Sequence, residues 1–341
     1  MKRIVFLLGA ACALIAGGLI WFNSDTPGQP STVVVYVSED QVFSEPILMD
    51  FERDTGIRIK AVYDTEETKS TGAMNRLIAE KGNPQADVYW ANEPIRAEVL
   101  KQKGISASYT SPNAKDIPPV FKDPEGFWTG FSARARVLVV NDSVENKPES
   151  ILDYLDPRWK GRSVIANPLF GTTTSEIAAL FTVWGDEKAK EFMAAMKANG
   201  VAISTSNGES TDFVASGKYD FSLVDTDDGV NRMKQGKPIT MVYPGQGENG
   251  RGCFIVPNAV VLIAGAPHPK EARLLIDYLL TRETERKLAF ADCAQIPLRP
   301  GVPSPAELKP LAEIKVMQVN YAEVAKKMVE IQPYLKSWLG I

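Results

Sequence analysis

The first regular pattern of the chain is a β-branched apolar run at residues 32–37, which ends in polar residues and predicts a buried strand followed by a loop. Apolar side chains then recur at helical spacing up to Gly56, a residue type that commonly ends helices. A second strand-like run follows at residues 57–62. Because strand, helix and strand follow one another at short spacing, the pattern predicts a parallel sheet in an α/β domain.

Strand-like and helix-like segments continue to alternate beyond this unit. Apolar runs predict further strands at residues 86–90, 131–140, 163–166, 221–224 and 253–263. Helical periodicity predicts helices at residues 71–81, 174–184, 187–199, 227–235, 269–281 and 283–290.

The two longest predicted strands bracket a central α/β block, so the chain is expected to leave a first domain, build a second and return. We expect a two-lobed α/β Venus-flytrap fold in which these strands lie side by side as a hinge and loops of both lobes face a cleft. The predicted division places lobe 1 at residues 32–134 and 258–305, lobe 2 at 135–257 and C-terminal helices at 306–341.

The first 31 residues are predicted to be a targeting segment rather than part of the fold. A basic pair precedes residues 4–22, which carry no charge and are long enough to cross about 30 Å of hydrocarbon as a helix. Small residues around Cys12 also fit a cleavage site, so a cleaved signal peptide and a membrane anchor both stay open. Either one predicts a periplasmic protein, or one anchored to the outer face of the cytoplasmic membrane. Since ATP and NADH are not supplied there, we expect no cofactor.

Composition narrows the choice of function. With 44% hydrophobic and 23% charged residues the chain can bury a large core, and its net charge of −4 without a basic stripe makes nucleic acid an unexpected partner. A single histidine, His268, excludes histidine-based triads and multi-histidine metal sites. Beyond the leader only Cys253 and Cys293 remain, which predicts either one disulfide bridge or two separate buried thiols.

Several collinear segments between residues 32 and 300 resemble the type II periplasmic solute-binding proteins of ABC importers, in the group that binds ferric iron, thiamine, polyamines or aminophosphonates. They read VYVSEDQ at 35–41, FERDTGI at 51–57, ADVYW at 86–90, IVPNA at 255–259, GAPHPKEA at 265–272 and AQIPL at 294–298. The resemblance implies the two-lobed fold, a small-molecule or ion ligand, a permease partner and no catalysis.

The resemblance does not carry over the ligands of the ferric binders. In those proteins a tyrosine pair on a strand-to-helix turn of the second lobe holds iron, helped by a histidine after the first strand. Here that turn reads LVDTDDG at 223–229 without tyrosine, and Asp40 stands at the histidine position. Phenolate ligation is therefore not expected, whereas metal ligation by Asp and Glu oxygens stays open.

The sharpest site hypothesis is the run Asp225, Thr226, Asp227 and Asp228. Its carboxylates repel one another, so at a cleft they favour a cation or an ammonium group. The alternative is structural, because Asp and Thr are preferred at the start of a helix.

A second hypothesis concerns Gly171, Thr172 and Thr173, where a predicted strand leads into a helix whose N–H groups can bind an anion. The alternative is that Thr173 or Thr174 simply caps that helix. Phe170, just before it, is expected either in the cleft wall or in the core.

Polar loops after the predicted strands supply the remaining candidates, because such loops meet the cleft of an α/β sheet. In the first lobe these ligand-binding candidates are Ser38, Glu39, Asp40, Glu66, Ser70, Thr71, Trp90 and Asn92. In the second lobe Asn207, in a predicted turn at 206–209, is added. Trp90 either stacks on the ligand or is a buried core residue.

One motif is expected to mislead. Residues 245–250 match the dinucleotide fingerprint G-x-G-x-x-G, which has that meaning only when a helix follows. Strand-like residues follow here, so we predict a loop near the hinge.

The leading function is therefore capture of a small polar solute, cationic, amine or zwitterionic, by a monomeric binding component of an ABC importer. Acidic loops favour a positive group and Gly-Thr-Thr-Thr an anionic one, so a zwitterion such as an aminophosphonate satisfies both. The alternatives are a ferric-iron or ferric-complex binding protein, a membrane-anchored ligand sensor and, least expected, a hydrolase or lyase.

Overall fold

The computed structural model describes residues 31–64 and 70–341. The targeting segment and Glu66 lie outside these residues. Among the described residues, the helices are all too short or too polar to cross a membrane.

Strands and helices alternate along the described chain. The strands are β1 (Thr32–Val37), β2 (Arg58–Tyr63), β3 (Val88–Ala91), β4 (Ser106–Ala107), β5 (Thr129–Asn141), β6 (Ser163–Ala166), β7 (Ala202–Ser204), β8 (Phe221–Asp225), β9 (Ile239–Val242) and β10 (Ile255–Ile263). The helices are α1 (Gln41–Thr55), α2 (Thr71–Ala79), α3 (Pro94–Gln102), α4 (Gly171–Trp184), α5 (Asp186–Ala198), α6 (Asn207–Ala215), α7 (Thr226–Lys234), α8 (Pro269–Leu279), α9 (Arg282–Phe290), α10 (Tyr321–Glu330) and α11 (Gln332–Leu339).

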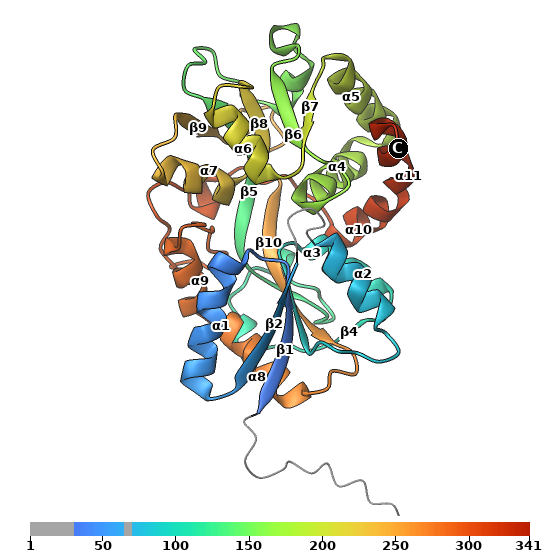
Figure 1. The fold of residues 1–341 in the computed structure, drawn as a ribbon, viewed down its shortest axis with the longest axis vertical. Helices are drawn as coiled ribbons and strands as arrows, with labels where there is room; N and C mark the ends of the chain where they lie inside the picture. Colours follow the sequence, from blue (N-terminus) through green and yellow to red (C-terminus); the bar gives the residue numbers. More distant parts are fainter. Residues whose placement is uncertain (1–30, 65–69) are drawn as a thin grey trace, which may run out of the picture. The chain divides into compact units, whose positions relative to one another are not determined.

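The described strands pair in the order β2-β1-β3-β10-β5-β8-β6-β7, with β4 beside β10 and β9 beside β5. Strands β1, β2 and β3 are parallel, as predicted, and β10 returns antiparallel to β3. Figure 1 shows two lobes along this sheet: the first lobe carries β1 to β4 with α1, α2, α3, α8 and α9, and the second carries β6 to β9 with α4 to α7. The fold is thus two-lobed α/β, as expected; the residue boundaries given above for the lobes stay a prediction.

The long strands β5 and β10 run through the middle of the sheet and pair with each other. Their register shifts between Pro257 and Asn258, and opposite this point Ser132 takes a positive φ of 39°, which is rare for a residue with a side chain. Past the shift, β5 pairs with β10 as far as Ala135, then with β8 from Arg136 and with β9 from Leu138. The two strands therefore connect the lobes, as expected of a hinge.

Elements with a strong local pattern match their predictions closely, whereas α3, α6, β4, β7 and β9 have no counterpart among them. Helix α3 is almost entirely buried, so it has no polar face and no amphipathic period. The predicted turn at 206–209 is wrong: these residues begin α6, where Ser206 accepts a hydrogen bond from the Glu209 N–H at 3.2 Å. The loop at 245–250 is followed by a strand, as expected.

The predicted cap of α4 is also wrong. The helix begins at Gly171, so the N-cap position is Phe170 and both Thr173 and Thr174 lie inside the first turn. Gly171 has a positive φ of 58°, which lets the chain turn sharply into the helix.

The two cysteines do not form the disulfide that the sequence allowed. Cys253 lies beside the Pro244 carbonyl oxygen and Gln246, whereas Cys293 lies beside the Leu288 carbonyl oxygen, and both are free and fully buried. Burial raises the pKa of both thiols, so the reactive thiolate is scarce.

We therefore expect Cys253 and Cys293 to resist alkylation in the native protein and to react fully after denaturation. Peptide mapping by mass spectrometry after native and denaturing alkylation measures this. A mass shift of the mature chain on reduction alone would contradict it.

Candidate ligand-binding site

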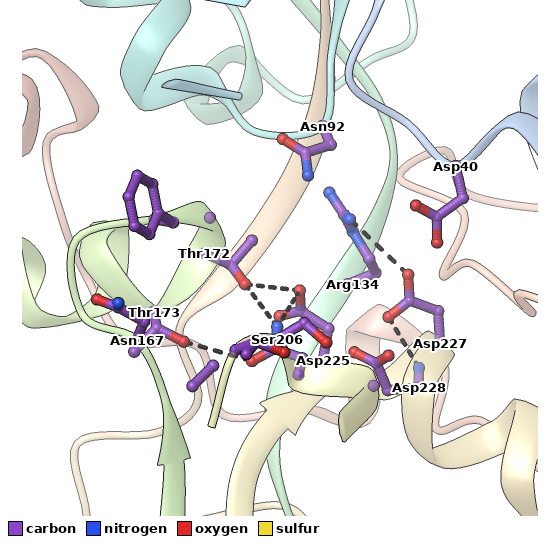
Figure 2. Close-up of a pocket in the computed structure, with 16 residues that line it drawn as sticks. Asp40, Asn92, Arg134, Asn167, Thr172, Thr173, Ser206, Asp225, Asp227 and Asp228 are labelled. Atoms are coloured by element: carbon purple, nitrogen blue, oxygen red, sulfur yellow. Dashed lines mark hydrogen bonds and ion pairs between the residues drawn. The ribbon is translucent and has the colours of Figure 1, made fainter. Parts of the chain in front are cut away.

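A cavity of about 60 Å³ lies between the lobes, beside the middle of β5, where β3 ends and α4, α6 and α7 begin (Figure 2). Since one water needs roughly 10–15 Å³ by the same measure, a space of this size suits a small solute of a few heavy atoms. Its lining includes nine of the residues proposed from the sequence: Asp40, Asn92, Gly171, Thr172, Thr173, Asn207, Asp225, Asp227 and Asp228. Their contact with a ligand stays a prediction.

The floor of the cavity is a buried ion cluster around Arg136 on β5. Its guanidinium donates to Glu176 at 2.8 Å and to Asp225 at 3.0 Å, and all three side chains are at most 5% exposed. Burial raises the pKa of Glu176, against the opposing charge of Arg136. This cluster binds β5, β8 and α4 together beneath the cavity.

Asp225 is fully engaged by the protein itself. Besides Arg136, it accepts hydrogen bonds from the Thr172 hydroxyl at 2.7 Å and from the Asn207 amide at 3.3 Å. Its side chain forms no cap bond to α7. Of the two sequence-based alternatives for Asp225, ligand or helix cap, the geometry favours neither: the carboxylate orders the starts of α4 and α6 around the cavity.

Arg134, two residues earlier on β5, is placed differently. It is 2% exposed, and its Nη1 lies 3.6 Å from Glu39 Oε2 and 3.8 Å from Asp227 Oδ2. Neither Nε nor Nη2 has a hydrogen-bond partner among the residues that the structure describes. In Figure 2 the guanidinium lies between Asn92 and Asp227.

The Arg134 guanidinium stays protonated although it is buried. Burial by itself lowers the pKa of Arg134, but the charges of Glu39 and Asp227 raise it above its usual value. Buried donors without acceptors are costly, and an oxyanion placed in the cavity would supply the missing acceptors.

The start of α4 adds further donors to the same cavity. Gly171, Thr172 and Thr173 line it, and the first N–H groups of a helix have no acceptor within the helix. The positive end of the helix dipole also favours a negative group here. Arg134 and α4 together form a subsite suited to an oxyanion.

Carboxylates dominate the opposite wall. Asp40 comes from the start of α1, while Asp227 and Asp228 lie in the first turn of α7. Within the described residues that line the cavity, Asp40, Asp227 and Asp228 lie opposite Arg134, whereas Asp225 is paired with Arg136, and none of the lining side chains is tyrosine, histidine or cysteine. Carboxylates are the side chains that bind an ammonium group by charge-assisted hydrogen bonds.

Six other candidates lie next to the cavity without lining it. Ser38 forms hydrogen bonds with Tyr89 and Asp64, and Glu39 accepts one from Gln295. Ser70 donates a hydrogen bond to Asn92, and Thr71 accepts one from Arg96. Trp90 donates to Asn258 in the core, and Thr226 accepts from the Ala135 N–H. For Trp90, which is fully buried, the core alternative is the one the structure supports. The structure thus places these six in positions that support neighbouring residues.

Sequence reasoning missed Arg134 and Ser206, which also line the cavity, and proposed no role for Asn167 by itself. Arg134 lies inside a strand whose sequence predicts a buried core strand. The candidates were sought in the polar loops after strands, so a residue within a strand was not among them. The alternation of two arginines within an otherwise apolar strand was the available clue.

Two lobes joined by paired strands, with a polar cavity between them, define a binding protein that closes around its ligand. Residues 47–316 match the model of the family described as bacterial extracellular solute-binding protein, and the chain belongs to that family. It is an extracytoplasmic solute-binding protein, and members of this family are binding proteins rather than enzymes.

Individual relatives are distant but cover nearly the whole chain. The chain is 25% identical to Iron uptake protein A1 of Synechocystis over 338 residues, covering 90% of this chain and 91% of the relative. It is 24% identical over 283 residues, 81% of each chain, to the putative 2-aminoethylphosphonate-binding periplasmic protein of Salmonella typhi. Among solved structures, iron-bound HitA from Pseudomonas aeruginosa superposes with a TM-score of 0.80 at 23% identity, covering 90% of this chain and 99% of HitA. These structural likenesses support the fold.

Proposed function

We propose that this protein captures a small zwitterion, with an oxyanion at one end and an ammonium group at the other, for delivery to an ABC permease. The observation that carries this proposal is Arg134, a buried guanidinium with two nitrogens that lack a partner among the described residues, facing a wall of carboxylates. The oxyanion binds Arg134, Asn92 and the start of α4. The ammonium group binds Asp40, Asp227 and Asp228.

An aminophosphonate fits these requirements better than a simple amine or a simple anion. A lone amine leaves Arg134 without an acceptor, and a lone anion faces the carboxylates. Relatives named as putative 2-aminoethylphosphonate-binding proteins support this class of ligand.

A ferric ion bound together with an anion is the second candidate. Oxygen atoms of Asp225, Asp227 and Asp228 lie within 4.8 Å of one another, a spacing that can hold a metal ion. Against it, Asp225 already accepts three hydrogen bonds from Arg136, Thr172 and Asn207, which a metal ion would have to displace.

A thermal-shift comparison separates these ligands. We expect 2-aminoethylphosphonate to raise the melting temperature, because a ligand that binds only the native state stabilises it by about 2.7 kcal/mol at roughly a hundred times its Kd. Ethylphosphonate lacks the ammonium group and ethanolamine lacks the anion, so both should give much smaller shifts. Isothermal titration then measures the affinity.

Ferric citrate, ferric nitrilotriacetate and thiamine complete the series. A shift with a ferric salt and none with 2-aminoethylphosphonate would replace the first proposal by the second. Equal shifts with ethanolamine and 2-aminoethylphosphonate would remove the role given to Arg134.

A further inference from the structure

A series of buried hydrogen bonds connects the core of the first lobe with Arg134. The Trp90 indole donates to Asn258 Oδ1 at 3.2 Å, and Asn258 Nδ2 donates to Gln295 Oε1 at 2.6 Å. Gln295 Nε2 donates to Glu39 Oε1 at 3.0 Å, and Glu39 Oε2 lies 3.6 Å from Arg134 Nη1. All five residues are at most 3% exposed. We call the four residues that lead to Arg134 the Trp90–Glu39 network.

The two ends of the Trp90–Glu39 network fix the direction of every bond in it. An indole N–H can only donate, so Asn258 turns its carbonyl oxygen toward Trp90 and its NH2 group toward Gln295. The Gln295 carbonyl oxygen accepts that bond, which leaves its NH2 group for Glu39. An ionised carboxylate can only accept, so the last bond suits a deprotonated Glu39. Each amide is therefore held in one orientation by its neighbours.

The backbone around Gln295 is placed by contacts of its own. Ala294, the residue before it, has a positive φ of 43°, which is rare for a residue with a side chain. The Gln295 N–H donates to the Leu288 carbonyl oxygen at 3.1 Å, and Ile296 exchanges two backbone hydrogen bonds with Ala133 at 2.7 Å. Strained backbone persists where surrounding contacts hold it, and it is common near functional sites. These contacts set the position from which the Gln295 side chain reaches into the network.

At the other end of the network, Glu39 holds one nitrogen of the Arg134 guanidinium. Nη1 lies 3.6 Å from Glu39 Oε2 and 3.8 Å from Asp227 Oδ2, whereas Nε and Nη2 have no hydrogen-bond partner within the described chain. Because a guanidinium is a rigid planar fork, the placement of one nitrogen affects where the other donors point. The position of the Glu39 carboxylate therefore affects how Arg134 presents its donors to an anion.

We propose that Gln295 is a positioning residue of the oxyanion subsite: it orients Glu39, and Glu39 orients Arg134 toward the bound anion. This inference rests on the proposed function, in which Arg134 binds the oxyanion of a zwitterion. Trp90, Asn258 and Gln295 do not line the cavity, so they act on the ligand only through the network.

The conservative variant Gln295→Glu turns this role into a dependence of affinity on pH. While the introduced carboxyl group is protonated, it can donate to Glu39 as the amide does. Once it ionises, two carboxylates repel each other across a contact that measures 3.0 Å in the parent protein. Such a pair raises the pKa of one of its members, so the repulsion grows as the pH rises. Glu39 is then displaced, and Arg134 with it.

The other titratable and charged groups at this point are the same in the parent and the variant. Burial, and after it the charges of Glu39 and Asp227, raise the pKa of the Cys293 thiol, so this thiol stays neutral. The carboxylates whose charges act on Arg134 are those of Glu39, Asp227, Asp225 and Asp40. The affinity of the variant is therefore divided by that of the parent at each pH, so that titration of the ligand and of these groups cancels.

We expect Gln295→Glu to bind 2-aminoethylphosphonate within about twofold of the parent at about pH 5, and about tenfold more weakly at about pH 8. Isothermal titration measures both affinities. Gln246→Glu is the matched control, because the Gln246 amide donates to the Pro244 and Lys315 carbonyl oxygens at 3.2 and 3.1 Å but does not line the cavity. Its affinity ratio should not change with pH. An equally flat ratio for Gln295→Glu would overturn the proposal.

The far end of the network provides a second variant. Trp90→Phe keeps an aromatic ring in the core but removes the donor, so the amides of Asn258 and Gln295 are no longer held in one orientation. We expect it to weaken binding about two- to fivefold. Trp128→Phe removes another buried indole, which donates to Glu98 at 2.7 Å, and should leave the affinity unchanged. Equal affinities of the two variants would count against the network.

The side-chain Nε–H resonance of Arg134, assigned by its loss in Arg134→Met, tests the same inference without a ligand. We expect this resonance to change with pH in Gln295→Glu beyond any change in the parent and in Gln246→Glu. If 2-aminoethylphosphonate does not bind the parent, the proposed ligand is wrong, and the resonance still decides whether Gln295 positions Arg134. Identical behaviour of the resonance in Gln295→Glu and the parent would overturn the inference.

Discussion

Replacing Arg136 with methionine is expected to lower the free energy of unfolding by about 3–5 kcal/mol, because it leaves Glu176 and Asp225 buried without their cation. Arg136 is itself fully buried and donates to both carboxylates as well as to Thr172, Thr173 and the Leu223 carbonyl oxygen. Urea unfolding followed by circular dichroism measures the loss. Arg158→Met removes an exposed arginine paired with Asp156 and should cost less than about 1 kcal/mol.

The free energy of unfolding that Arg136→Met loses should become larger as the pH rises. Without the opposing charge of Arg136, burial raises the pKa of Glu176 in the folded state further above its value in the unfolded state. Stability contributed by a group with a raised folded pKa is present in acid and lost as the pH rises. The variant should therefore approach the parent protein in acid, near the usual glutamate pKa of 4.5, and fall behind it as the pH rises through the raised pKa of Glu176.

Neutralising the two carboxylates should restore the stability that Arg136→Met loses. Arg136→Met combined with Glu176→Gln and Asp225→Asn should recover much of the lost stability, since no buried charge is then unpaired. A loss below about 1 kcal/mol in the single variant, or no recovery in the triple variant, would show that this cluster does not hold β5, β8 and α4 together.

Replacing Arg134 with methionine should have the opposite profile, a large loss of affinity with a much smaller loss of stability. We expect binding of 2-aminoethylphosphonate to weaken about a hundredfold, because charge-assisted hydrogen bonds to a buried oxyanion contribute roughly 1.5–3 kcal/mol each. Stability should change less than in Arg136→Met because the ion pairs of Arg134 are long, 3.6 Å to Glu39 and 3.8 Å to Asp227, its Nε and Nη2 make no hydrogen bonds within the described chain, and Glu39 keeps its bond from Gln295. Calorimetric titration and urea unfolding of the same preparations give both quantities.

The two arginine variants serve as controls for each other. They remove the same side chain from the same strand, two residues apart, so a general disturbance of β5 would affect both alike. If Arg134→Met loses stability as Arg136→Met does and keeps its affinity, Arg134 is a structural residue and the oxyanion subsite is misplaced. Arg134→Lys, which keeps the charge without the planar fork of donors, should lie between parent and methionine variant in affinity.

The elements that could be predicted from the sequence are those whose signal is local. Strand β1 is a β-branched run, α1 buries Ile47, Leu48 and Phe51 at helical spacing, and α7 begins among aspartates. Such patterns depend on the periodicity of side chains along one segment. The order of these segments was sufficient to expect two lobes, a hinge of two long strands and a cleft bordered by Asp40, Asp227 and Asp228.

The tertiary structure decided everything that depends on partners distant in the chain. Arg134 and Arg136 are indistinguishable in the sequence. In the structure Arg136 pairs with Glu176 and Asp225 from other elements, whereas Arg134 faces the cavity. The sequence grouped Asp225 with Asp227 and Asp228 in one acidic cluster, but in the structure Arg136, Thr172 and Asn207 surround Asp225 and donate to it. The burial and pairing of a charged group depend on side chains brought together only by folding, and these determine whether it stabilises the fold or remains available to a ligand.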